Sequence, residues 1–366
     1  MKRKLTALLF SLTFAAYIMG CGSKEEETAN VNMEIIEDTG TEAGKETEEA
    51  VEDIIPEGMY RSELTNELIP EEIKNQRPIA AMVDNEKTAL PHFGISQADI
   101  VYEMMNSTKN DRITRLMVLV KDWGSIEQLG SIRSLRPTNI LLAGEWDAVI
   151  CHDGGPFYND PYLAEEHIQN FSGTFSRVKN GKAWEFTEYI LPGDLEKNFE
   201  NSGYSTEYTE YYPGPHFQFA TEANPVDLSE SGESQDAAKV ILPFEHNGSY
   251  LEYDEASQLY QYYEYGSAHV DAGNNNTQTA FKNVVIQYST FHQYDENGYM
   301  IFNCIDTDKP GYYITNGKVI PITWSKTSST DITRYYDSEG NEITLNTGKT
   351  YIAFVPDDNW EELRIQ

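Results

Sequence analysis

The sequence is poor in basic residues, with 27 Lys and Arg against 60 Asp and Glu and a formal net charge of −33. A nucleic-acid binder needs a basic stripe that neutralises phosphates, so this balance argues against that class of protein. It also disfavours direct adhesion to an anionic membrane surface. The chain has only three cysteines, which is too few for a disulfide scaffold.

Common catalytic signatures are missing as well. The sequence contains no P-loop, no G-x-S-x-G, no H-E-x-x-H and no C-x-x-C. Their absence disfavours the motif-bearing hydrolases and nucleotide-binding enzymes. What the sequence does contain is 39% hydrophobic and 12% aromatic residues, enough for packed cores. A length of 366 residues suggests about two domains.

Residues 1–20 are predicted to be a lipoprotein signal peptide. A basic start precedes an apolar segment over 5–18, which is short for a membrane-spanning helix. Gly20 followed by Cys21 resembles a bacterial lipobox, so we expect Cys21 to be lipidated and to become the mature N-terminus. The alternative is an ordinary signal peptide with an incidental cysteine. A lipidated Cys21 predicts a protein anchored at the extracytoplasmic face of the cell membrane.

The segment that follows is strongly acidic. Residues 22–57 hold 13 Asp and Glu, carry a net charge of −11 and include no aromatic residue. Such a composition cannot bury enough apolar surface to offset the entropy of ordering. Residues 21–57 are therefore predicted to be the lipidated cysteine and a disordered tether that holds the folded part away from an anionic surface.

The remaining sequence predicts an α+β protein with two domains. In residues 58–220, buried strands are expected over 78–83, 98–104, 114–121 and 148–151, with a helix over 134–146, so this part reads as a mixed α/β domain. Residues 221–237 are predicted to be a linker. Residues 238–366 are expected to form a mostly β domain, a small barrel or a sandwich, because short strand candidates alternate there with turn residues.

Two arginines at the start of the predicted helix are the most informative pattern. Arg133 and Arg136 stand three residues apart where a helix N-terminus would present N–H groups and a positive dipole end. Arginine adds planar donors that match phosphate or carboxylate. One hypothesis is therefore an anion-binding pocket. The other is that both arginines pair with internal Asp or Glu and fasten the domain.

His152 and Asp153 directly follow the predicted strand over 148–151. Side chains at the end of such a strand, next to glycines, commonly line sites in α/β folds. His152 could act as an acid or base, with Asp153 orienting it, or both could be satisfied structural residues. Cys151 is more simply read as a buried apolar residue, and whether it pairs with Cys304 is left open.

Carboxylates at other strand ends could meet the arginines. Asp84 and Asn85 close the first buried strand, and Glu103 lies near the end of the second. If Asp84, Glu103 and Asp153 converge at one sheet edge, they would form either a site for an ion such as Mg²⁺ or a salt-bridge network with the arginines. In the second half, His269 and Asp271 form an H-x-D pair that is most simply a strand end and turn.

A set of motifs in a fixed order carries a family resemblance. It comprises Arg77-Pro78-Ile79-Ala80, Val83-Asp84-Asn85, residues 96–103, Ser131-Ile132-Arg133-Ser134-Leu135-Arg136-Pro137 and His152-Asp153-Gly154-Gly155, then residues 266–271, 313–318 and 322–326. This set resembles the YerB-like family of bacterial lipoproteins. The resemblance implies an envelope lipoprotein with an N-terminal α/β domain and a C-terminal β domain, and it implies no particular reaction. Members usually carry Pro-His-Asn near the end of the first domain, where this chain has residues 182–187, so an activity served by that histidine would be altered.

A looser analogy concerns the LytR-CpsA-Psr envelope glycan transferases. These enzymes also place an Asp at the end of an apolar strand, an Asp-bearing strand and an arginine turn in that order. The analogy would assign a pyrophosphate to Arg133 and Arg136, and a divalent metal such as Mg²⁺ to Asp84 or Asp99.

Three functions follow from these observations. The leading hypothesis is a lipid-anchored protein that binds an anionic envelope ligand, a glycan or a lipid-linked phosphate, through Arg133 and Arg136. The second is a metal-dependent envelope transferase or hydrolase. The third is a non-catalytic scaffold that recruits an envelope protein through its β domain.

Overall fold

The computed structural model describes residues 55–366. The predicted signal peptide (1–20), the lipidation site Cys21 and the tether up to residue 54 lie outside the described residues. Among the helices that are described, none has the length and apolar character needed to cross a membrane.

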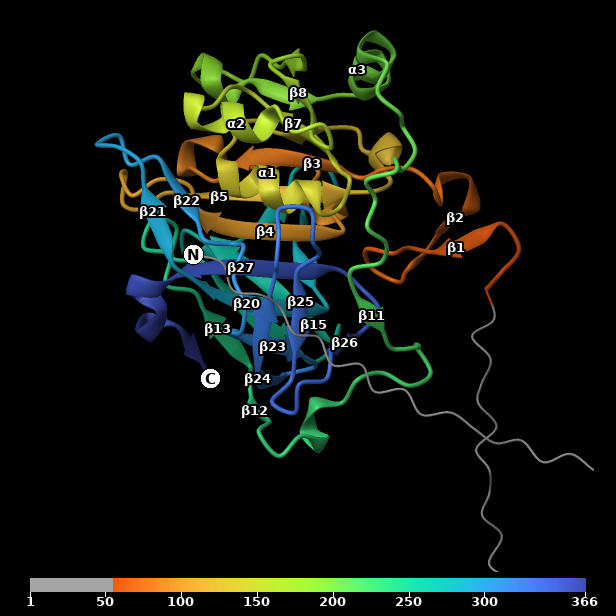
Figure 1. The fold of residues 1–366 in the computed structure, drawn as a ribbon, viewed down its shortest axis with the longest axis vertical. Coiled ribbons are helices and arrows are strands. Elements are labelled where there is room, and N and C mark those ends of the chain that lie inside the picture. The colour runs from red at the N-terminus through yellow and green to blue at the C-terminus, as the bar shows by residue number, and fades with distance from the viewer. Residues whose placement is uncertain (1–54) are drawn as a thin grey trace, which may run out of the picture. The chain divides into compact units, whose positions relative to one another are not determined.

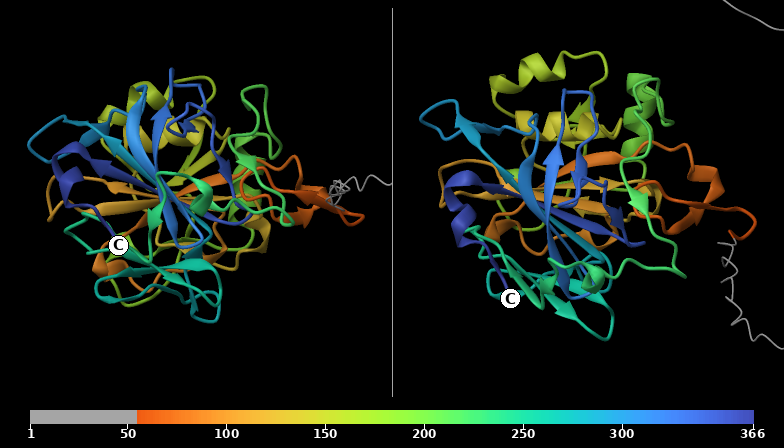
Figure 2. Two further views of the ribbon diagram at one scale, coloured as in Figure 1. Left: turned by 90° about the horizontal axis from the view of Figure 1, so that it is seen from below. Right: turned by 60° about the horizontal axis from the view of Figure 1, so that its bottom comes forward.

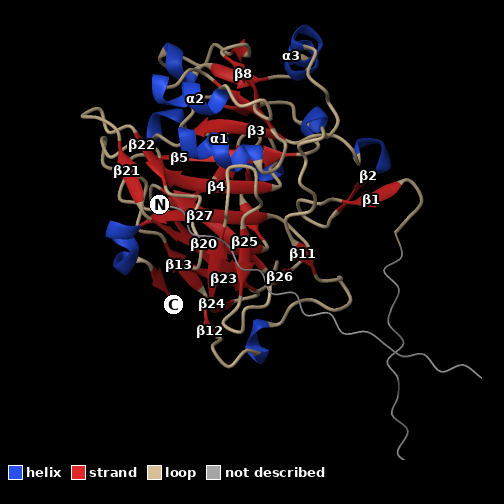
Figure 3. Ribbon diagram, in the orientation of Figure 1, coloured by secondary structure: helices blue, strands red, loops and turns tan. Residues whose placement is uncertain are grey.

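Strands dominate the described part of the chain, and helices are few (Figure 3). Within residues 55–366 the largest sheet has eleven strands. Their order is β12 (Gln235–Asp236), β24 (Lys318–Ser325), β23 (Lys309–Thr315), β20 (Asn283–Ser289), β27 (Thr350–Pro356), β4 (Ile100–Met105), β5 (Thr114–Val120), β3 (Ile79–Asp84), β7 (Val149–His152) and β8 (Gln169–Ser172), with β25 (Arg334–Tyr336) paired to β24.

This large sheet joins the two predicted domains. β27 pairs in parallel with β4, and the register sets Thr350 opposite Ile100 and Phe354 opposite Met104. In Figure 1 the blue strand β27 accordingly lies beside the orange strand β4, although the two come from opposite ends of the described chain. The sheet is therefore continuous from one predicted domain to the other.

The central strands are buried on both faces of the sheet. In β3, Ile79, Ala81 and Val83 enter one apolar core, while Ala80 and Met82 enter the other. Successive side chains of a strand point to opposite faces, so a continuous apolar run is what a doubly covered strand requires. This is why the apolar runs of the sequence located the strands of the first half.

Helices cover parts of both faces. α1 (Pro137–Gly144) packs Ile140 and Leu142 into one core, and it runs along the face of the sheet near β4 and β5 (Figure 1). α3 (Asp194–Ser202) contributes Leu195 and Phe199 to the core of the opposite face. The short α2 (Asp160–Leu163) follows β7. The helix expected over 134–146 is present but shorter, and it begins at Pro137, a position that proline favours because its missing N–H is not needed there.

A second, six-stranded sheet covers one face of the large sheet with Val240, Leu251 and Tyr260. Figure 2 shows its strands as a separate layer at the lower edge of the view. Its order is β16 (Ser267–Ala268), β15 (Leu259–Glu264), β14 (Tyr250–Asp254), β13 (Lys239–Ile241) and β28 (Arg364–Ile365), with β19 (Ala280–Phe281) paired to β15.

Smaller sheets complete the described fold. They are β1 (Met59–Arg61) with β2 (Leu68–Pro70), β6 (Leu129–Gly130) with β10 (Glu188–Ile190) and β9 (Ser176–Arg177), β11 (Gln218–Phe219) with β26 (Thr344–Leu345), β17 (Val270–Asp271) with β18 (Thr277–Gln278), and β21 (Phe291–Gln293) with β22 (Met300–Phe302).

The expectation of a small barrel in the second half is wrong. The strands of that half form open sheets, and their longest members extend a sheet that continues into the first half. A barrel would need the edge strands of the second half to pair with one another. Here β27 instead pairs with β4, so the edge of β27 that a barrel would need joins the second half of the chain to the first.

Cys151 and Cys304 are both free and fully buried. Cys151 belongs to one apolar core and Cys304 to the other, so the sheet separates them. Burial raises the pKa of both thiols, that of Cys304 to about 12. They behave as small apolar side chains in this structure.

Candidate functional site

Three arginines meet at the end of β3. Arg133 lies on the loop between β6 and α1, where its backbone N–H donates to the carbonyl of Met82. Arg115 at the start of β5 is paired in register with Asp84. Arg115 donates to the carbonyl of Ser134 at 2.8 Å, and Arg136 donates to the hydroxyl of the same residue at 3.4 Å. The predicted pair is therefore part of a cluster of three, which we call the arginine cluster: Arg115, Arg133 and Arg136.

Arg133 is paired internally. Its Nε lies 2.6 Å from Asp84 Oδ2, and its second amino group lies 2.9 Å from Glu185 Oε2. Asp84 is buried and also lies 4.0 Å from Arg115, whereas Glu185 is half exposed. For Arg133 the structure therefore has the internal pairing that was one of the two readings of the sequence. Arg133 is therefore exposed to solvent at the end of its side chain that contacts Glu185.

Arg136 is different because it has no carboxylate partner within the part of the chain that the structure describes. Its Nε donates to the Asn106 carbonyl at 3.1 Å, and another N–H donates to the Leu135 carbonyl at 2.8 Å. The ring of Tyr299 covers the guanidinium, with its centroid 4.9 Å away. Burial, and then the neighbouring Arg115, lower the pKa of Arg136 to about 9. The site thus holds a nearly buried cation whose charge no neighbouring side chain balances.

The turn that follows β7 adjoins the arginine loop. The N–H of Asp153 donates to the Arg133 carbonyl at 3.0 Å, and the N–H of Leu135 donates to the Gly154 carbonyl at 3.1 Å. His152 has partners at both ring nitrogens, the Gly154 carbonyl at 2.8 Å and Asn170 at 3.0 Å. A histidine held in this way has no free nitrogen for acid–base work, which favours the structural reading of His152.

Asp153 belongs to a triad that the sequence did not predict. Arg177 lies 2.7 Å from Asp153 and 2.6 Å from Glu188, so one guanidinium holds both carboxylates. Burial and the nearby Asp153 raise the pKa of Glu188 to about 7. Glu188 and Arg177 stand on β10 and β9, whose pairing no local sequence signal indicates.

Glu103 and Asn85 do not join the arginines. Asn85 donates to Glu103 at 3.1 Å, and Glu103 is fully buried. Glu103 also accepts from Asn247 at 2.7 Å and from Tyr262 at 2.8 Å, as well as from the Tyr351 hydroxyl. These donors come from the second half of the chain. Glu103 therefore links the two halves of the chain through buried hydrogen bonds, and both of its carboxylate oxygens already accept hydrogen bonds.

Asp84 and Asp99, the two alternative metal ligands of the envelope-transferase analogy, lie at opposite ends of their strands. The antiparallel pairing of β3 and β4 with β5 sets Asp84 opposite Arg115, while Asp99 accepts from the N–H of Lys121 at the other end of the strands, at 2.6 Å. Five or six residues of strand separate the two levels, roughly 16–20 Å. Asp84 and Asp99 therefore cannot share a metal ion. In the described residues, the spacing that suits a metal occurs at His92, Glu264 and His269.

Comparison with known proteins agrees with this architecture. Residues 64–205 match the family described as "Protein of unknown function (DUF3048) N-terminal domain", and residues 240–352 match its C-terminal domain. "Putative lipoprotein YerB" of Bacillus subtilis (strain 168) is 23% identical over 304 residues, covering 81% of this chain and 86% of the relative. The crystal structure of YerB from Bacillus subtilis superposes with a TM-score of 0.71 at 20% identity and covers 84% of this chain and 99% of that chain.

Proposed function

Because this chain belongs to the YerB-like family of two-domain proteins, we propose that it is an extracytoplasmic lipoprotein that binds an anionic ligand of the cell envelope at the arginine cluster. The lipidated Cys21 and the acidic tether belong to this proposal, as does the division into an α/β domain and a β domain. The resemblance to a lipoprotein and the lipobox pattern support the membrane anchor.

One observation carries the binding proposal: the unbalanced charge of Arg136. The guanidinium groups of Arg115 and Arg136 both contact Ser134, and Arg115 and Arg133 both approach Asp84. Among the described residues, the carboxylates paired with this cluster are those of Asp84 and Glu185. Both of these carboxylates contact Arg133, and no carboxylate of residues 55–366 pairs with Arg136. Burying a charge is unfavourable unless a partner compensates it. A bound phosphate or carboxylate would supply that partner in the bidentate geometry that arginine favours.

Exposed aromatic rings border the cluster and favour a ligand that carries sugars. Trp184 precedes Glu185 and is 71% exposed. Phe157 is 69% exposed and packs on Tyr158, with ring centroids 4.1 Å apart. Tyr158 in turn lies 6.4 Å from Tyr299, the ring that covers Arg136. Exposed aromatic faces next to cations suit a phosphorylated glycan, because the rings stack on sugars while the cations hold the anion.

The test is a binding titration of the full chain in detergent with a soluble phosphorylated glycan and, separately, with a short-chain polyprenyl phosphate. Arg136→Gln should weaken binding roughly 10- to 100-fold, the value of one charge-assisted hydrogen bond. The control is Arg364→Gln, which removes the same charge from an exposed strand at the edge of the six-stranded sheet. Unchanged affinity of a folded Arg136→Gln protein for both ligands would show that the arginine cluster is not the binding site.

A further inference from the structure

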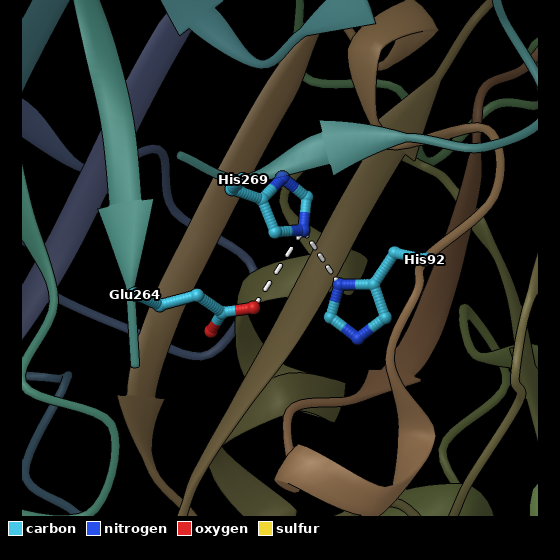
Figure 4. A group of neighbouring side chains, drawn as sticks. All are labelled: His92, Glu264 and His269. Atoms are coloured by element: carbon cyan, nitrogen blue, oxygen red, sulfur yellow. Dashed lines mark hydrogen bonds and ion pairs between the residues drawn. The ribbon is translucent and has the colours of Figure 1, made fainter. Parts of the chain in front are cut away.

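Two histidines and a glutamate lie together in a place that the arginine cluster does not use. His92 Nδ1 lies 2.7 Å from His269 Nε2, and His269 Nε2 lies 3.8 Å from Glu264 Oε1 (Figure 4). All three ligand atoms fall within 4.8 Å of one another, and all three residues are buried. His92 comes from the first half of the chain, while Glu264 and His269 come from the six-stranded sheet and the loop after it.

From this arrangement we propose a binding site for a divalent transition-metal ion, with Zn²⁺ as the best fit, formed by His92 Nδ1, His269 Nε2 and Glu264 Oε1. Two imidazoles and one carboxylate are a common zinc donor set, and the metal would take a fourth ligand from solvent. Ligand atoms about 2.0–2.1 Å from a tetrahedral metal lie about 3.3 Å apart. The two ring nitrogens would therefore separate by about 0.6 Å, and Glu264 Oε1 would move about 0.5 Å closer to His269 Nε2.

Each ligand is oriented by a second hydrogen bond. His92 Nε2 donates to the backbone carbonyl of Asp84 at 2.6 Å, which leaves the lone pair on Nδ1, the atom that faces His269. His269 Nδ1 lies 2.8 Å from the hydroxyl of Thr279, so Nε2 can present its lone pair. Asn247 donates to the other oxygen of Glu264 at 3.3 Å. Such outer partners are typical of metal sites, because they fix the tautomer and the direction of each ligand.

An unsatisfied atom points to a missing partner. Glu264 Oε1 is buried and has no hydrogen-bond partner among the described residues. Buried polar atoms without partners are costly and therefore rare in native proteins. The orphaned oxygen faces the two imidazoles, in the position where a metal would accept it as a ligand.

The local charge also favours a cation. Glu103 and Glu264 are both buried near each other, and Asn247 donates to both. Neither carboxylate has a Lys or Arg within 4.0 Å in the described part of the chain. Two neighbouring buried carboxylates would repel each other if both were ionised, and a divalent ion between them and the imidazoles would offset that charge.

A cavity of about 400 Å³ gives access to the site. Its lining includes Glu264, His269, Tyr265, Lys87 and Ala268. The cavity reaches the side of the site formed by Glu264 and His269, where a metal would enter and water would take the fourth position. This site is independent of the arginine cluster, although Asp84 touches both, through its carbonyl to His92 and its carboxylate to Arg133.

The test uses the full chain, without an added histidine tag, after treatment with a chelator. Titration with ZnCl₂ is expected to show one tight site per chain and to raise Tm by about 5 °C or more at saturation. Glu264→Gln and His269→Gln should each weaken zinc binding at least about tenfold. His292→Gln is the matched control, because it removes an exposed histidine from β21 and should keep the tight site.

X-ray absorption spectroscopy at the zinc edge of the unmodified, zinc-loaded chain gives a second measurement, which does not require that the variants fold. We expect the spectrum to show scattering from two imidazole ligands. A zinc ion bound by oxygen ligands alone would overturn the proposal, because the carboxylates of the acidic tether could supply such ligands. Wild-type affinity in a folded Glu264→Gln and a folded His269→Gln would overturn it as well.

Discussion

Buried cations in this protein are usually paired with a carboxylate. Arg77 lies 3.0 Å from Asp147, and Lys326 lies 3.0 Å from Glu145, with all four side chains almost completely inaccessible to solvent. Such pairs fasten one segment to another, because removing one partner leaves the other charge buried and unpaired. Arg136 departs from this pattern, which is the reason it is the residue on which the binding proposal rests.

A buried histidine gives a prediction for acid stability. His216 stacks on Trp146 with ring centroids 3.5 Å apart. Burial first, and then the nearby Lys326 and Arg334, lower the pKa of His216 well below its usual value. The unfolded chain therefore takes up a proton that the folded chain does not. The stability contributed by the neutral ring is complete above about pH 6.5 and is lost as the pH falls below that value.

We expect His216→Phe to reduce this acid sensitivity, since phenylalanine keeps the stacking on Trp146 and cannot take up a proton. Between pH 7 and pH 5 the wild-type protein should lose about 2 kcal/mol of unfolding free energy more than the variant. Urea denaturation at the two pH values measures the difference, with the pH 7 pair as the internal control. Parallel losses in the two proteins would contradict the prediction.

At the scale of elements, the strand positions follow directly from apolar runs. The run over 78–83 became β3, and the run over 114–121 became β5. These strands are central and doubly covered, so every residue in them is buried and the sequence signal is strong. Short edge elements such as β9 and β12 were not predicted, because two paired residues leave no periodic pattern.

One central pairing depends on a close backbone approach. A Cβ added at Gly311 would lie 2.5 Å from the carbonyl of Ile286, on the neighbouring strand β20. We expect Gly311→Ala to push β23 away from β20 and to cost about 1–3 kcal/mol of unfolding free energy. Gly124→Ala is the matched control, since an added Cβ there meets no atom within 4 Å. Chemical denaturation of both variants measures the effect, and equal stabilities would contradict it.

At the scale of the whole molecule, the two halves share one sheet and one buried polar network. β4 pairs with β27, and Glu103 accepts hydrogen bonds from Asn247 and Tyr262. A first half without its partner would expose the edge of β4 and leave Glu103 buried without its donors. The two predicted domains are thus expected to depend on each other for stability.

We predict that the described residues unfold in one cooperative transition and that a chain truncated after residue 237 does not fold stably. Calorimetry of the full chain should show one major peak whose calorimetric and van't Hoff enthalpies agree. The truncated chain should show little near-ultraviolet circular dichroism and should aggregate. Two well-separated peaks, or a soluble truncated chain with native spectra, would refute the shared-sheet interpretation.

The candidate sites could be predicted only in part. The sequence located Arg133 and Arg136 because both stand in one short loop before a helix, a local pattern. The sequence did not indicate that Arg115 lies next to them in the fold. His269 was noted as part of an H-x-D pair, whereas no local pattern marked His92 or Glu264. His92 could not be linked to His269 from the sequence, because 177 residues separate them.

The local features of this protein follow from its amino-acid order: the apolar runs that become central strands, the proline that starts α1 and the acidic balance that argues against nucleic acids. These depend on the chemistry of neighbouring residues. Other features depend on long-range packing: β27 pairs with β4, Arg133 pairs with Asp84 while Arg136 has no carboxylate partner among residues 55–366, and two histidines meet a glutamate. Such contacts depend on which distant segments pack together, and the local periodicity of a sequence does not indicate those segments.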